Sequence, residues 1–127
     1  MKKTLTLSLI LLLFPVFISA QSNEEALKRL LEKFCQEYYS DCFSGRSYVR
    51  NTLDIENISI NDEDVIKVSG THAYRGSYGS LYEDMDFYVY ITKRSSKIIF
   101  EFHKKAKADF FHSTDYWEEC TQSVSID

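Results

Sequence analysis

The stretch Met85-Asp86-Phe87-Tyr88-Val89-Tyr90-Ile91-Thr92 alternates strictly between two kinds of side chain. Successive side chains of a β-strand point to opposite faces of the sheet. One face of this segment is therefore fully apolar and suited to cover a core, whereas the other presents Tyr88 and Tyr90. The pattern predicts a strand over residues 85–93 with one buried side and one tyrosine-bearing side.

Three further segments show the same period of two and predict strands over residues 48–60, 65–75 and 98–103. Short polar turns join most of them, which is typical of an antiparallel meander. Within the first segment the apolar positions change parity, so we expect a bulge near Glu56-Asn57. A longer connection, residues 76–84, precedes the strand quoted above and carries two further tyrosines.

A helix is predicted before the strands, because apolar side chains recur at steps of three and four from Leu27 to Cys42. Residues 22–25 (Ser-Asn-Glu-Glu) have the pattern of a capping box, and Ser44-Gly45 is a helix stop. A helix with a single apolar stripe must bury that stripe, and the apolar face of the sheet is the available surface.

After the last strand, Asp115 with Glu118 predicts the cap of a short C-terminal helix. We expect an aromatic group in this tail to close one end of the core, with an exposed patch for a partner as the alternative: Phe110, Phe111, Tyr116 and Trp117. The predicted fold class is α+β, with one N-terminal amphipathic helix packed on a curved four-stranded antiparallel sheet and a short C-terminal helix or tail.

Residues 1–20 have the layout of a secretory signal peptide: two lysines, an apolar run broken by Pro15, and a small-residue exit at Ala20. Cleavage after Ala20 would leave residues 21–127 as a single α+β domain, exported to the periplasm or the medium. The alternative is an uncleaved membrane anchor, although the run is shorter than the roughly 20 apolar residues that span a bilayer.

The charge of the predicted mature chain argues against two classes of partner. Without Lys2 and Lys3, 13 basic residues face 19 acidic ones, a net charge of −6. Nucleic acids and anionic membrane surfaces need a basic stripe. We therefore expect no nucleic-acid partner, and no membrane partner after signal cleavage.

Three cysteines cannot all pair. On one helix, Cys35 and Cys42 would stand about 10 Å apart, too far for a disulfide. Either could instead meet Cys120. We favour Cys42–Cys120, because both lie at element ends, with Cys35 in the core; three reduced thiols are the alternative. The cysteines and histidines lack the paired short spacings of structural zinc sites, so no metal or other cofactor is predicted.

One helix followed by an antiparallel meander, residues 22–103, resembles the cystatin-like superfamily, including the small NTF2-like proteins. The NTF2-like resemblance implies a cup that can host acid–base chemistry, with Asp86 as base and Tyr88 or His103 as donor. The cystatin resemblance implies protease inhibition through a Gln-x-Val-x-Gly motif. Residues 66–70 read Ile-Lys-Val-Ser-Gly, which keeps the valine and the glycine but not the glutamine, and Trp117 lacks the proline that precedes the second-loop tryptophan of that family.

The candidate ligand-binding residues lie on the tyrosine-bearing face: Tyr88, Tyr90, Glu101, His103 and Arg75. Tyrosines offer flat apolar area with an orienting hydroxyl, which suits a small amphipathic molecule or a protein partner. The alternative is a set of ordinary cross-strand pairs on a solvated sheet. We therefore predict an exported, non-enzymatic binding or interaction domain that uses this face or the 76–84 loop, with no catalytic residue assigned. A cystatin-like inhibitor and an NTF2-like enzyme are the alternatives.

Overall fold

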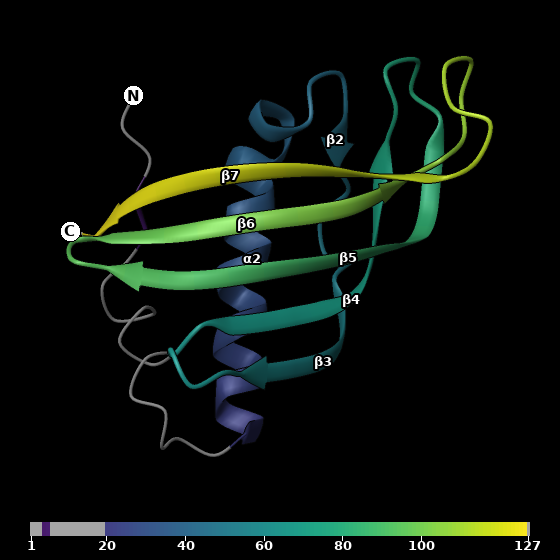
Figure 1. Ribbon diagram of the computed structural model, residues 1–127. Coiled ribbons are helices and arrows are strands. Elements are labelled where there is room, and N and C mark those ends of the chain that lie inside the picture. The colour runs from purple at the N-terminus through teal and green to yellow at the C-terminus, as the bar shows by residue number, and fades with distance from the viewer. Residues whose placement is uncertain (1–3, 6–19, 127) are drawn as a thin grey trace.

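The computed structural model describes residues 4–5 and 20–126 (Figure 1). The predicted signal peptide lies outside the described residues, apart from Thr4, Leu5 and Ala20. The elements in chain order are β1 (Thr4–Leu5), α2 (Ala20–Cys42), β2 (Ser47–Tyr48), β3 (Asp54–Ile60), β4 (Ile66–Arg75), β5 (Leu81–Arg94), β6 (Lys97–Ala106) and β7 (Tyr116–Ile126).

These strands form one sheet in the order β1-β7-β6-β5-β4-β2, and β3 pairs with β4 beside β2. The short β1 runs parallel to β7, and the other pairs are antiparallel. Figure 1 shows the long strands β4 to β7 curling as a half-barrel across one side of α2. The core lies between that helix and the inner face of the sheet.

Helix α2 confirms the predicted amphipathic stripe. Leu30 and Leu31 are fully buried, and the ring of Phe34 stacks on Phe100 of β6 with centroids 4.3 Å apart. The apolar face of β5, represented by Phe87, joins the same core. Each fully buried side chain of this kind stabilises the fold by roughly 2 kcal/mol. The helix begins at Ala20, so the predicted capping box lies within its first turn rather than ahead of it.

The predicted four-stranded sheet with a short C-terminal helix is wrong. Residues 116–126 form strand β7, which pairs with β6 from Ala106↔Tyr116 to Lys97↔Ser125. The capping pattern at Asp115 reflects only a local preference for starting a helix. A helix there would leave the whole edge of β6 without backbone partners, whereas β7 satisfies that edge and buries Val124 in the core.

A buried ion pair also joins β7 to β6. Lys104 of β6 is fully buried and donates a hydrogen bond of 2.6 Å to Glu118 Oε1 on β7. Burial lowers the pKa of Lys104, and the hydrogen bond to Glu118 opposes that shift. Arg46 approaches the same carboxylate at 3.7 Å. Removing Glu118 would leave a buried ammonium without its partner, a change that costs far more than the loss of a surface pair.

The first predicted strand is divided into β2 and β3, which occupy successive parts of the same edge of β4. Asn51 lies between them with a φ of 64°, a left-handed conformation that interrupts the strand. The predicted bulge is confirmed, because the register with β4 shifts between Ile55 and Asn57. Gly70 lies opposite this bulge, where a Cβ would meet the Asp54 carbonyl oxygen at 1.9 Å.

Strand β5 begins at Leu81, so the connection after β4 spans residues 76–80 and not 76–84 as predicted. The pairs Arg75↔Leu81 and Tyr74↔Tyr82 extend the ladder to the turn. The Tyr74 and Tyr82 rings lie 5.2 Å apart. This cross-strand packing stabilises the extension, and alternation of side chains along the sequence does not reveal it.

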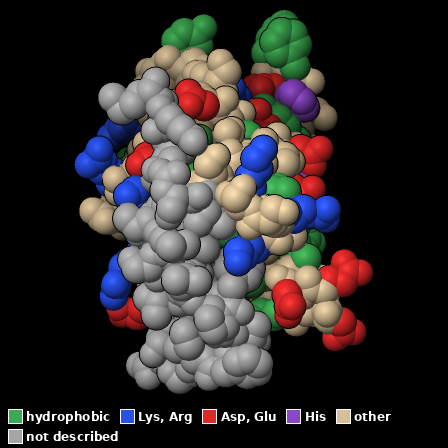
Figure 2. All heavy atoms as spheres, turned by 90° about the vertical axis from the view of Figure 1, so that its left-hand side faces the viewer, with side chains coloured by type: hydrophobic (Ala, Val, Ile, Leu, Met, Phe, Trp, Pro, Cys, Tyr) green, Lys and Arg blue, Asp and Glu red, His purple; other side chains and the backbone are tan. Residues whose placement is uncertain are grey.

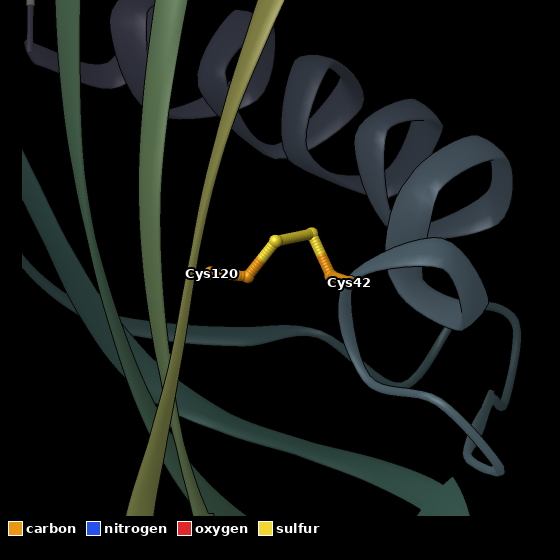
Figure 3. The surroundings of a disulfide bond; sticks show 2 residues. All are labelled: Cys42 and Cys120. Atoms are coloured by element: carbon orange, nitrogen blue, oxygen red, sulfur yellow. A yellow bond between two sulfur atoms is a disulfide. The ribbon is translucent and has the colours of Figure 1, made fainter.

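The predicted disulfide between Cys42 and Cys120 is present, with the two Cα atoms 5.4 Å apart. Figure 3 shows it crossing from the end of α2 to β7. Cys35 is free and fully buried, and burial raises the pKa of its thiol. The bridge thus joins the only helix among the described residues to a strand 78 positions away.

We predict that the Cys42→Ala/Cys120→Ala variant loses about 4 kcal/mol of unfolding free energy, because cross-linking over 78 positions removes much loop entropy from the unfolded chain. Urea denaturation of the oxidised protein and the variant measures the difference. Wild-type protein in reducing agent is the control and should match the variant. A loss below about 1 kcal/mol would contradict the prediction.

His72 is a buried core residue, as its phase on the strand predicts. Its Nδ1 lies 2.8 Å from the Met85 carbonyl oxygen, and its Nε2 lies 2.8 Å from the Tyr39 hydroxyl. A carbonyl can only accept, so Nδ1 donates and Nε2 accepts from Tyr39, which describes a neutral ring. Burial lowers the pKa of His72 from 6.5 to about 4.

The shift of His72 predicts a loss of stability in acid. The unfolded chain binds this proton below pH 6.5 and the folded chain only near pH 4, so stability is complete above pH 6.5 and falls as the pH drops through that window. The contribution is about 3 kcal/mol. Urea denaturation at pH 7 and pH 4.5 should show a smaller drop for His72→Gln than for wild type, and equal drops would contradict the assignment.

Candidate functional site

The candidate site is the outer face of the sheet, on the side away from α2. Because the odd-numbered residues from Met85 to Ile91 of β5 fill the core, Tyr88 and Tyr90 point outward. The ladder places Tyr88 opposite His103 and Tyr90 opposite Glu101 on β6. The four predicted residues Tyr88, Tyr90, Glu101 and His103 are therefore brought together.

Ring stacking organises this face. The Tyr88 and His103 rings are nearly parallel, at 13°, with centroids 4.3 Å apart. Tyr90 meets both rings edge-on, at 5.9 Å from Tyr88 and 6.2 Å from His103. Such pairs contribute about 0.5–1.5 kcal/mol beyond their area, so the cluster is well held before any ligand binds.

Two residues that the sequence interpretation did not assign to this face complete the cluster. Trp117 of β7 lies 5.0 Å from Tyr88 and is 46% exposed. The ammonium group of Lys67 on β4 lies 5.2 Å from the centre of the Tyr88 ring. The β-branched residues Thr121 and Val124 were the available signal that the C-terminal segment is a strand, and hence that Trp117 could join the sheet.

Carboxylates flank His103 on both sides. Its Nε2 lies 3.2 Å from Glu101 Oε2, and its Nδ1 lies 3.5 Å from Glu119 Oε2. The His103 side chain is 11% exposed, and its Nε2 makes no hydrogen bond of good geometry with any described residue despite the short distance to Glu101. This face can thus offer the exposed carboxylates of Glu101 and Glu119 to a ligand that lies over the rings.

Next to this cluster the surface is hollowed into an open depression of about 410 Å³. Its lining is contributed by the three strands β5, β6 and β7 and by the residue before β4: Val65, Tyr90, Thr92, Arg94, Ile99, Glu101 and Thr121. Tyr90 and Glu101 belong to both the cluster and the depression. The two features therefore form one continuous surface, called the outer-face site below.

Arg75 does not join the outer-face site. It is the last residue of β4, whereas Lys67 and Ser69 of the same strand are the partners of Tyr90 and Tyr88. The Arg75 guanidinium instead donates a 3.1 Å hydrogen bond to the Gly79 carbonyl of the adjoining turn. Its function there is local, because it helps to shape the 76–80 connection.

Asp86 was proposed for the enzyme alternative, and the segment around Val68 for the inhibitor alternative. The carboxylates within ion-pair distance of His103 are Glu101 and Glu119, whereas Asp86 is exposed opposite Thr71. Val68 is fully buried in the middle of β4, so the Val-x-Gly segment forms no exposed wedge. Within residues 4–5 and 20–126, no cluster of three or more His, Cys, Asp or Glu side chains could hold a metal ion.

The tail aromatics were expected to close the core, and this is wrong, because Trp117 lies on the outer face and Tyr116 stacks on His112 outside the core cluster. Phe110 is 95% exposed and Phe111 is 85% exposed, at the tip of the β6–β7 hairpin. The C-terminal segment forms strand β7 and does not pack as a helix on the core. The turn between β6 and β7 therefore projects beyond the part of the sheet that α2 covers (Figure 1).

Comparison with known proteins finds no match to this chain among protein-family models, curated proteins or solved structures. The cystatin-like resemblance therefore stays a prediction. In the described part of the chain, no helix has both the length and the apolar character needed to cross a membrane.

We predict that Tyr88→Ala shifts the fluorescence of Trp117, the single tryptophan of the chain, to longer wavelength, because Tyr88 shields one side of the indole. The variant should also lose about 1–2 kcal/mol of unfolding free energy with its ring contacts. Tyr78→Ala is the matched control, since Tyr78 is fully exposed in the 76–80 turn, outside the ring cluster. An unchanged emission spectrum for Tyr88→Ala would show that Trp117 does not pack on this ring.

Proposed function

We propose that this protein is an exported, non-enzymatic binding domain that holds a small amphipathic molecule at the outer-face site. The observation that carries the proposal is the open depression of about 410 Å³ that adjoins a pre-stacked aromatic cluster. Ligand sites of small molecules are typically concave, mostly apolar and largely formed before binding.

The lining of the depression suits an amphipathic ligand. Val65, Ile99 and the Tyr90 ring offer apolar area, and Thr92 and Thr121 add hydroxyl groups. Glu101 and Arg94 supply one charge of each sign at the same surface. A ligand with one flat apolar part and one polar or charged group could use both kinds of contact.

The aromatic cluster favours binding because its rings are already fixed in place. Tyr88 and Tyr90 are half-buried and held by mutual contacts, so little side-chain entropy is lost when a ligand covers them. Trp117 leaves nearly half of its surface exposed at the margin of the cluster. A solvated sheet would not need so much apolar ring area on its outer side.

Two observations support export. Residues 1–20 have the sequence pattern of a signal peptide, and a disulfide joins Cys42 to Cys120. Disulfides persist mainly in oxidising compartments such as the periplasm and the extracellular medium. We place the protein there as part of the proposal.

The test is a screen of small ring-containing molecules that carry one amine or hydroxyl group, read by amide chemical-shift changes in NMR spectra. We expect hits to shift residues around Tyr90 and Glu101, and Tyr90→Ala/Glu101→Gln to weaken them at least tenfold. The matched control is Tyr78→Ala/Glu56→Gln, the same substitutions at exposed positions outside the site. Hits that retain full affinity for the first variant, or a screen without hits, would contradict the proposal.

A further inference from the structure

Three large aromatic side chains stand exposed on the tips of two hairpins. Tyr78, in the β4–β5 connection, is 100% exposed, and Phe110 and Phe111, in the β6–β7 connection, are 95% and 85% exposed. Figure 2 shows two groups of hydrophobic side chains protruding at one end of the molecule. We call these three residues the aromatic tips.

The β6–β7 tip is a tight, well-braced turn. Asp109 and His112 exchange two backbone hydrogen bonds, of 3.0 and 3.2 Å, which leaves Phe110 and Phe111 alone at the apex. The Asp109 carboxylate also accepts hydrogen bonds from the Phe111 amide at 2.9 Å and from the Tyr116 hydroxyl at 3.0 Å. These contacts fix the direction in which the two phenylalanines project.

The same bracing includes His112. Its Nδ1 lies 2.8 Å from Asp109 Oδ1, and its ring stacks on Tyr116 with centroids 3.6 Å apart. The hydrogen bond from His112, followed by the bond from Tyr116, lowers the pKa of Asp109 below its ordinary value. A turn of nine exposed residues, 107–115, therefore carries several side-chain bonds whose common effect is to hold two phenylalanines in water.

The two hairpins lie next to each other. A small pocket of about 210 Å³ takes its lining from Tyr78 and its neighbours on one side and from Lys107 and Asp109 on the other. Figure 1 shows the β4–β5 and β6–β7 hairpins side by side, and the shared pocket joins their tips into one surface with a notch between two projections.

We propose that the aromatic tips form a docking surface that inserts Phe110 and Phe111 into an apolar cleft of another protein, with Tyr78 as a second contact. Rigid aromatic anchors lose little entropy on binding and dominate the energy of protein interfaces. Three such side chains present several hundred Å² of area, close to the buried centre of a standard interface. The exposure of Phe110 and Phe111 lowers solubility, and neither side chain contributes to the packing of the core.

The charge around the tips selects a protein over a membrane. The two hairpins carry a surplus of acid: Arg75 and Lys107 against Glu83, Asp84, Asp109 and Asp115. Lys107 is paired with Asp115 at 3.7 Å, which leaves the surplus of two acidic charges unchanged. An anionic bilayer would be repelled by this surplus, whereas a cleft with a basic rim would be attracted.

This surface is distinct from the outer-face site. The tips lie beyond the end of β4 and the start of β7, and none of the three aromatic residues lines the depression beside Tyr90. The docking proposal can therefore fail while ligand binding at the outer-face site holds, and the reverse is also possible.

The test places a photoreactive phenylalanine analogue, p-benzoylphenylalanine, at position 111 and at position 78 in cells that make the protein. Position 60 is the matched control, because Ile60 is an exposed apolar residue at the far end of the sheet. We expect both tip positions, and not position 60, to cross-link to the same protein. The purified partner should then bind the unmodified chain, and Phe110→Ser/Phe111→Ser should weaken that binding at least tenfold while Ile60→Ser leaves it unchanged.

Several results would overturn the proposal: adducts with lipid or with a second copy of this chain, no protein adduct, or the same adducts from position 60. Cosedimentation of the wild-type chain with phosphatidylcholine–phosphatidylglycerol vesicles, abolished by the double serine variant, would assign the tips to a membrane instead. Thermal denaturation of each variant checks its fold; the double serine variant should melt as wild type does, because Phe110 and Phe111 lie in solvent.

Asp109→Ala tests the bracing of the turn separately, since it keeps both phenylalanines. We expect faster amide hydrogen exchange at residues 110–112, an unchanged melting temperature, and a weaker affinity for the cross-linked partner than wild type. Asp62→Ala, in the β3–β4 turn at the other end of the sheet, is the control. Full affinity of Asp109→Ala, despite faster exchange, would show that the bracing of this turn does not contribute to binding.

Discussion

The burial of the apolar stripe of α2 in the curl of the sheet is the constraint on which the rest of the structure depends. The stack of Phe34 on Phe100 lies at the centre of that contact. Because one face of every long strand must serve this core, the alternate residues are committed to the outer face, whatever their chemistry. The outer-face cluster of Tyr88, Tyr90 and His103 is therefore a direct consequence of how the helix is covered.

Strand β7 is held to this core in two ways. The Cys42–Cys120 disulfide ties it to the end of α2, and Glu118 meets the buried ammonium group of Lys104. With β7 fixed, Trp117 and Glu119 take their places beside the ring stack. The composition of the outer face thus depends on a strand that closes one edge of the sheet, far along the chain from the residues it joins.

The two candidate surfaces differ in physical character. The outer face consists of half-buried rings that satisfy one another across strands, next to an open depression, which suits a small ligand. The aromatic tips are almost completely exposed and are held by polar bonds within their own turn, which suits insertion into another protein. The same fold can carry both, because its long strands extend past the length of sheet that α2 covers (Figure 1).

Local patterning determined a large part of this protein. The helix stripe, the bulge near Asn57, the outward phase of Tyr88 and the choice of Cys42 as the helix cysteine in the bridge all follow from side-chain period and element ends. The tertiary structure alone decided that residues 116–126 are a strand, that Arg75 lies apart from the cluster, and that Phe111 faces water. The physical reason is that these outcomes depend on backbone pairing and contacts between distant segments, and a local pattern such as a helix cap cannot report which unpaired edge the chain will satisfy.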